Sequence, residues 1–128
     1  MRLWHQELLV LLPRAQILGQ HRECCALRGM GWGRKHSTVD YVFTHSVMRL
    51  VDYHQLVLRE MERRGYKPAI QWYCPEYRGK NNMPWSCALP CEHYLSAEIF
   101  IYSEHDDAYL EECLANLKKK GVDLSQRV

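Results

Sequence analysis

One amphipathic segment between residues 44 and 65 constrains the fold of this chain most strongly. Side chains suited to burial recur there at spacings of three and four residues, the repeat of one face of an α-helix. They are Val47, Leu50, Val51, His54, Val57, Leu58 and Met61. Thr44 or Ser46 is suited to cap the first turn, and Gly65 followed by Pro68 ends the pattern. A helix with such a stripe is stable only when another apolar surface covers it.

Two further segments have helical spacing and helical end signals. One runs from about Pro13 to Leu27, with proline in its opening turn and Gly29 where a left-handed residue often ends a helix. The other begins at Asp106, a good N-cap, and ends before Gly121. A shorter amphipathic turn, Trp4 to Leu12, precedes the first. These segments predict three helices around one core.

The stretch from Trp72 to Ser96 contains three of the five prolines and is typical of a long irregular connection. Glu98 to Tyr102 has the composition of a short strand but lacks an obvious partner. We therefore predict an all-α fold: a compact single domain over residues 1–128, with three main helices, a short N-terminal helix and a long irregular loop.

Composition sets limits on the class of protein. A hydrophobic content of 47% and a charged content of 25% are typical of one soluble domain. The net charge of +2 is too small to indicate a nucleic-acid partner by itself. No stretch has the length of a membrane span, and the first residues lack the features of a signal peptide. We expect a cytoplasmic monomer with reduced thiols that does not bind membranes.

The first predicted helix carries an acidic residue on a polar face. At 100° per residue, Glu23 shares its face with Gln16, Gly19, Gln20 and Leu27, so we expect its carboxylate to point outward. The opposite, apolar side holds Ile17, Leu18, Cys24 and Cys25. Glycine within a helix costs about 1 kcal/mol relative to alanine, which suggests that something approaches closely at this face. That neighbour is either a ligand or another helix, with Glu23 then a solvated surface acid.

Four short motifs follow one another in a family-like order. They are Gln16-Ile17-Leu18-Gly19-Gln20-His21-Arg22-Glu23, Arg34-Lys35-His36, Arg63-Arg64-Gly65-Tyr66 and Pro75-Glu76-Tyr77-Arg78-Gly79. This order resembles the phage-type pyrimidine-dimer DNA glycosylases with apurinic/apyrimidinic (AP) lyase activity, also called endonuclease V, up to about Leu117. The resemblance implies an all-α repair enzyme that removes the base at an ultraviolet-damaged pyrimidine pair and then nicks the abasic strand. It also implies double-stranded DNA with damaged or abasic sites as the partner, and no metal or organic cofactor.

The resemblance also implies the catalytic groups. In that family the nucleophile is the N-terminal α-amine and the acid is the glutamate of an Arg-Glu pair, which map onto Met1 and onto Arg22 and Glu23. An unperturbed α-amine has a pKa of about 7.7 to 8.0, against about 10.4 for lysine, so far more of it is unprotonated near neutral pH. Such an amine can attack C1′, expel the base and leave an imine that permits β-elimination. Glu23 would stabilise the developing positive charge and transfer protons.

Basic and aromatic residues in two clusters, residues 29–35 and 72–80, are suited to hold DNA by phosphate contacts and stacking. The residues that we predict to contact DNA are Arg2, Arg22, Arg28, Trp32, Arg34, Lys35, His36, Tyr77, Arg78 and Lys80. The alternative for each cluster is a surface turn whose aromatic side chain is packed into the core.

The chain departs from the family pattern in three places. The family has a further catalytic-site arginine where this chain has Ala26, and the nearest substitute, Arg28, would point toward the apolar side of the helix. The family's aromatic C-terminal tail has no counterpart in Val122 to Val128. The Trp72 to Ser96 loop is longer and richer in cysteine and aromatic residues. These differences leave the lesion that the chain would recognise open.

Two other interpretations remain. Cys74, Cys87, Cys91 and His93 could bind zinc, with Cys24 or Cys25 as a further candidate ligand. The Cys-x3-Cys-x-His spacing is not the usual pair of well-spaced ligand pairs. The chain could instead be a non-catalytic nucleic-acid or protein-binding module that keeps the fold. For the remaining groups we expect core-filling or capping roles at Cys24, Cys25, His21, His45 and His54, and active-site neighbours at His5 and His36.

Overall fold

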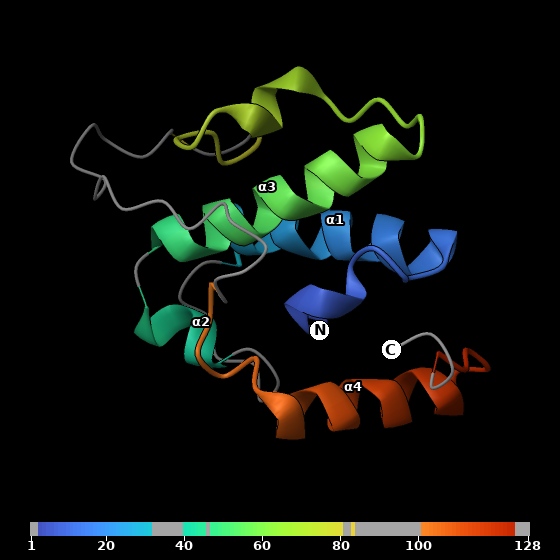
Figure 1. The fold of residues 1–128 in the computed structure, drawn as a ribbon. Helices are drawn as coiled ribbons and strands as arrows, with labels where there is room; N and C mark the ends of the chain where they lie inside the picture. Colours follow the sequence, from blue (N-terminus) through green and yellow to red (C-terminus); the bar gives the residue numbers. More distant parts are fainter. Residues whose placement is uncertain (1–2, 32–39, 46, 81–82, 84–100, 125–128) are drawn as a thin grey trace.

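The computed structural model describes residues 3–31, 40–45, 47–80, 83 and 101–124, which form helices joined by turns and contain no strand (Figure 1). In chain order the elements are η1 (Gln6–Leu8), α1 (Arg14–Arg28), α2 (Asp40–Thr44), α3 (Val47–Arg63), η2 (Ile70–Tyr73) and α4 (Asp107–Lys119). The predicted all-α class is confirmed, as are the three long helices. None of the helices in these residues is long and apolar enough to cross a membrane.

The core lies where α1 and α3 pack along each other, with η1 and α4 below them in the view of Figure 1. From α1, Ile17, Cys24 and Leu27 are fully buried, and α3 contributes Leu50 and Val57 at the predicted spacing. Burying one such aliphatic side chain contributes about 1.5–3 kcal/mol. The apolar stripes of the two helices are therefore what hold them together.

The predicted ends of α3 and α4 are largely confirmed. Gly65, with a φ of 89°, ends α3, and Tyr66 N–H donates to Met61 O at 2.9 Å across it. Asp106 caps α4 by accepting from Tyr109 N–H at 2.9 Å, and Gly121 ends that helix with a φ of 86°. Of the two predicted caps of α3, Thr44 is instead the last residue of α2, and Ser46 lies outside the described residues, so that cap stays a prediction.

The end of α1 differs from the prediction. Gly29 has a φ of −88°, so it is not the left-handed residue that we expected. The glycine that this turn requires is Gly31, whose N–H donates to Ala26 O at 2.9 Å. A Cβ atom at Gly31 would lie 2.8 Å from the same oxygen, closer than side chains allow. After α1 the backbone at Gly31 therefore passes close to the Ala26 carbonyl, where only glycine fits.

The two irregular segments are described in part. The long connection after Trp72 begins inside the short helix η2, and most of residues 81–100 lie outside the described residues. Ile101 and Tyr102 are fully buried and are not part of a strand. Ile101 N–H donates to the Gln6 side-chain oxygen at 2.9 Å, which joins the segment before α4 to η1.

His105, at the entrance to α4, is buried as a neutral ring. Its Nδ1 accepts from Gln6 N–H at 3.1 Å, so the ring proton lies on Nε2, 2.9 Å from the Tyr41 hydroxyl. Burial lowers its pKa from 6.5 to about 3. The fold therefore depends on this imidazole staying uncharged.

We predict an acid-side loss of stability from His105. Below pH 6.5 the unfolded chain protonates this ring, whereas the folded chain does not until about pH 3. The free energy of unfolding should fall as the pH falls through this window, by up to about 1.4 kcal/mol per pH unit for this ring. Urea unfolding between pH 7 and 4 measures it. His105→Gln should give a shallower slope than the wild type; equal slopes would contradict the prediction.

Candidate active site

The backbone of the first two described residues, Leu3 and Trp4, is hydrogen-bonded to three helices. Trp4 N–H donates to the Gln20 side-chain oxygen at 2.7 Å, and the Tyr53 hydroxyl donates to Trp4 O at 2.5 Å. The Tyr109 hydroxyl of α4 donates to the carbonyl of Leu3. We call Gln20, Tyr53 and Tyr109 the N-terminal clamp. It fixes the start of the described chain against α1 and α3.

Two members of the N-terminal clamp, Gln20 and Tyr53, are buried, and their hydrogen bonds satisfy polar groups that burial would otherwise penalise. Gln20 is 1% exposed, Tyr53 is fully buried, and the Tyr53 hydroxyl lies 3.1 Å from the Gln20 side-chain oxygen. Burial raises the pKa of Tyr53 well above its ordinary value, so its hydroxyl remains a donor. The Leu3 and Trp4 side chains are buried with them. The N-terminal segment is thus held by hydrogen bonds and by the burial of two apolar side chains.

Glu23 lies three residues after Gln20 on α1, and its side chain is partly buried rather than fully outward. Gln20 and Leu27, predicted on the same outward face, are buried, whereas Leu18 and Cys25 of the predicted apolar side are only half-buried. The predicted division of faces was therefore wrong in part. The N-terminal segment covers the Gln20 side of α1, and a helix covered from two directions has a wider buried face.

Arg28 does not have the position that a DNA contact requires. Its side chain is fully buried, with Nη1 donating to Trp72 O at 2.9 Å and Nη2 donating to Cys74 O at 2.7 Å and to Tyr77 O at 2.9 Å. Nη1 also lies 3.0 Å from His54 Nδ1. Burial lowers the pKa of Arg28 to about 10, which leaves it charged at neutral pH. The inward orientation expected from the helix is confirmed, and the predicted DNA contact is corrected to a structural role.

The described part of the 72–80 cluster packs against the end of α1. Arg78 Nε donates to Arg28 O at 2.9 Å and its Nη2 donates to Gly29 O at 3.1 Å, at the negative end of the helix. The ring of Tyr77 lies 4.8 Å from that of Trp72 in an edge-on arrangement. These contacts favour the packed-aromatic interpretation for Trp72 and Tyr77. Lys80 is exposed.

The histidines and cysteines have mainly structural contacts. His5 caps η1 by accepting from Glu7 N–H at 3.1 Å, and His45 lies 3.0 Å from a Glu104 carboxylate oxygen. Cys24 is fully buried, as expected, and Cys74 is exposed. Several predicted residues lie outside the described ones: Met1, Arg2, Trp32, Arg34, Lys35, His36, Cys87, Cys91 and His93.

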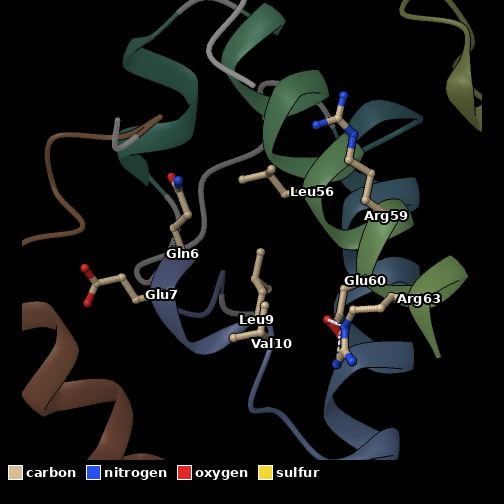
Figure 2. Close-up of a pocket in the computed structure, with 8 residues that line it drawn as sticks. All are labelled: Gln6, Glu7, Leu9, Val10, Leu56, Arg59, Glu60 and Arg63. Carbon is tan, nitrogen blue, oxygen red and sulfur yellow. Dashed lines mark hydrogen bonds and ion pairs between the residues drawn. The ribbon is translucent and has the colours of Figure 1, made fainter. Parts of the chain in front are cut away.

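A pocket of about 360 Å³ opens between η1 and α3 (Figure 2). Its apolar floor is Leu9, Val10 and Leu56, and its rim is polar. Gln6, Glu7, Arg59, Glu60 and Arg63 complete the lining. On the α3 side, Arg63 Nη2 lies 2.6 Å from a Glu60 oxygen, a pair drawn with dashed lines in Figure 2. Among the residues that the structure describes, no predicted site residue lines this pocket.

The sequence analysis missed the N-terminal clamp. A signal for it existed in α1, because Gln20 follows Ile17 by three residues and precedes Cys24 by four, and so interrupts an apolar stripe with an amide. A polar group at such a position must find a partner when buried. Which partner it finds is a matter of tertiary structure.

These features define a helical domain whose first described residues, Leu3 and Trp4, are hydrogen-bonded to α4 and to α1 at Gln20, three residues before Glu23. A family model described as pyrimidine dimer DNA glycosylase matches residues 1–74. This match covers more than half of the chain, including Glu23 and two clamp residues, Gln20 and Tyr53. The chain belongs to the pyrimidine dimer DNA glycosylase family, which implies DNA as its substrate. No curated protein and no solved structure matches it.

We predict that Arg28→Met destabilises the fold by about 2–4 kcal/mol, because three carbonyls and His54 lose a charged donor in a buried setting. Arg22→Met on the same helix is the matched control; Arg22 is exposed, and its replacement should change stability by no more than about 0.5 kcal/mol. Urea unfolding at pH 7 measures both. Equal stabilities of the two variants would show that Arg28 does not hold the 72–78 segment.

Proposed function

We propose that this chain is a DNA glycosylase with AP lyase activity in which the α-amine of Met1 is the nucleophile and Glu23 assists it. The observation that carries the proposal is the N-terminal clamp. It bonds Trp4 to α1 at Gln20, less than one helical turn from Glu23, and Leu3 to Tyr109 of α4.

Reach supports this assignment. Met1 and Arg2 precede Leu3, and two extended residues span at most about 7 Å. Along α1, the step from Gln20 to Glu23 is about 4.5 Å. These lengths support the proposal that the Met1 amine reaches the Glu23 carboxylate. Extending the chain before Met1 would convert this amine into an amide, which has no basic lone pair.

The chemistry follows from an amine and a carboxylate alone. The amine lone pair forms a bond to C1′ as the glycosidic bond breaks. The base departs with the electron pair of the glycosidic bond and takes up a proton. Opening of the sugar gives a protonated imine. Loss of a C2′ proton then expels the 3′ phosphate, and water hydrolyses the imine to release Met1. Glu23 stabilises the positive charge on the sugar and carries the protons.

Cationic and aromatic side chains would hold the double-stranded DNA. Exposed Arg22 and Lys80 are suited to phosphate contacts. Tyr77 and Arg78 are half-buried, so only their exposed edges can contribute. The proposed set also includes Arg2, Trp32, Arg34, Lys35 and His36, whereas Arg28 is removed from it because of its burial.

The test is borohydride trapping on a DNA duplex with one abasic site, using untagged protein. An imine is reduced to a stable covalent adduct, so the wild type should give an adduct band and, without borohydride, a nicked strand. Glu23→Gln should lower the trapping rate by about a hundredfold or more, within the range of general acid–base and electrostatic contributions. Acetylating the α-amine should abolish trapping.

The outcome separates two functions. Adduct and nicking from the wild type, lost on blocking Met1, support the enzyme. DNA binding with no adduct and no nicking would instead support a non-catalytic nucleic-acid-binding module, the second function compatible with this fold. A duplex that carries a pyrimidine dimer in place of the abasic site then tests base removal separately from strand nicking.

The N-terminal clamp makes a further prediction. Gln20→Met keeps the side-chain volume but removes the acceptor for Trp4 N–H, so the amine should lose its fixed position. A misplacement of about 1 Å can lower a rate about a hundredfold, and we expect trapping by Gln20→Met to slow by between about tenfold and a hundredfold.

The matched control is Gln16→Met, the same change one turn earlier on α1, where Gln16 is half-buried. Its trapping rate should stay within about twofold of the wild type. Circular dichroism and thermal melts check that both variants fold. Equal rates for the two variants would mean that the clamp does not position the nucleophile.

A further inference from the structure

Three potential metal ligands meet on a side of α1 away from Glu23. His21 and Cys25 lie one turn apart on α1, and His54 faces them from α3. His21 Nδ1 lies 2.9 Å from His54 Nε2, and Cys25 Sγ lies 3.8 Å from His21 Nδ1 and 4.0 Å from His54 Nε2. At 100° per residue, His21 and Cys25 each lie about 200° around the helix from Glu23. The cluster is independent of the proposed active site.

The spacing of these atoms is close to that of a tetrahedral metal site. Zinc binds histidine nitrogen at about 2.0–2.1 Å and cysteine sulfur at about 2.3 Å. At tetrahedral angles these bond lengths place two nitrogens about 3.3 Å apart, and a nitrogen and a sulfur about 3.6 Å apart. The separations observed between one donor atom of each residue depart from these values by roughly 0.4 Å or less. Small side-chain adjustments would suffice.

The surroundings suit a bound ion with one open position. His54 is fully buried, whereas His21 and Cys25 are half-buried, so an ion could enter from their side. The Trp72 ring lies 5.6 Å from the His54 ring and 6.4 Å from the His21 ring, and forms an apolar wall. Three protein ligands with a fourth position left for water or another ligand is an arrangement that zinc adopts outside closed structural sites.

Arg28 should lower the affinity of these three ligands for a metal ion. A guanidinium only donates, so its Nη1 beside His54 Nδ1 keeps the His54 ring proton on Nε2, which then donates to His21 Nδ1. A metal bound at Nε2 moves that proton to Nδ1, and the thiol proton of Cys25 passes to solvent. Arg28 would lose its contact with His54 and keep its three bonds to carbonyls. Binding should be weaker than in a dedicated structural zinc site.

We propose that His21, Cys25 and His54 form a binding site for a thiophilic divalent transition metal, with Zn²⁺ as the ion that this two-nitrogen, one-sulfur donor set fits best. The site joins α1 to α3 under Trp72. A bound ion would cross-link the two helices of the core.

Cobalt is the probe, because a Co²⁺–thiolate bond absorbs in the near ultraviolet and tetrahedral Co²⁺ absorbs strongly in the visible. Untagged protein, freed of metal with a chelator, is titrated with Co²⁺. We expect both bands to saturate at one equivalent and to disappear when Zn²⁺ is added. Cys25→Ser should remove the thiolate band, and His21→Asn should weaken binding at least tenfold.

The matched control is a combined Cys74→Ser, Cys87→Ser and Cys91→Ser variant, which removes the cysteines of the long connection and should keep both bands. Far-ultraviolet circular dichroism confirms that each variant is folded. Two results would overturn the proposal: a folded wild type with no thiolate band at one equivalent, or a band that survives Cys25→Ser and is lost in the triple variant. The second result would assign the metal to the long connection.

Discussion

The hydrogen bonds at the Leu3–Trp4 peptide and the Trp4 carbonyl are the interaction on which the rest of this structure depends. Gln20 and Tyr53 would be costly to bury alone, by about 1–3 kcal/mol for an unsatisfied polar group, and the backbone of Trp4 supplies their partners. Tyr109 adds a contact from α4 at Leu3. The same bonds that satisfy the core therefore attach Trp4 to α1 at Gln20, three residues before Glu23. The hydrogen bonds that hold α1, α3 and α4 at Leu3 and Trp4 are therefore also the bonds on which the proposed chemistry depends.

Some arginines of the chain stabilise the fold, and other basic residues are exposed to solvent. Arg28 and Arg78 bind carbonyl groups at the junction of α1 with residues 72–77, and Arg63 and Arg64 share the buried carboxylate of Glu60. Because the net charge is only +2, phosphate contacts depend on where the other basic groups lie and not on the charge of the whole molecule.

Local features of the fold were predictable, and features that join distant segments were not. The ends of α3 and α4 follow from Gly65, Asp106 and Gly121, because caps and left-handed glycines act within a few residues. Helix geometry alone also oriented Arg28 inward. The buried face of α1 was misjudged because Trp4, 16 residues before Gln20, covers it. The partners of Arg28, 44 to 49 residues away, could not be read from a periodic pattern either.

The position of the nucleophile is the central claim, and peptide mapping of the reduced protein–DNA adduct tests it most directly. After nuclease and protease digestion, tandem mass spectrometry locates the sugar remnant on one nitrogen of the chain. The account predicts the remnant on the α-nitrogen of the peptide that begins with Met1. A remnant on a lysine side chain, for example that of the exposed Lys80, would contradict it.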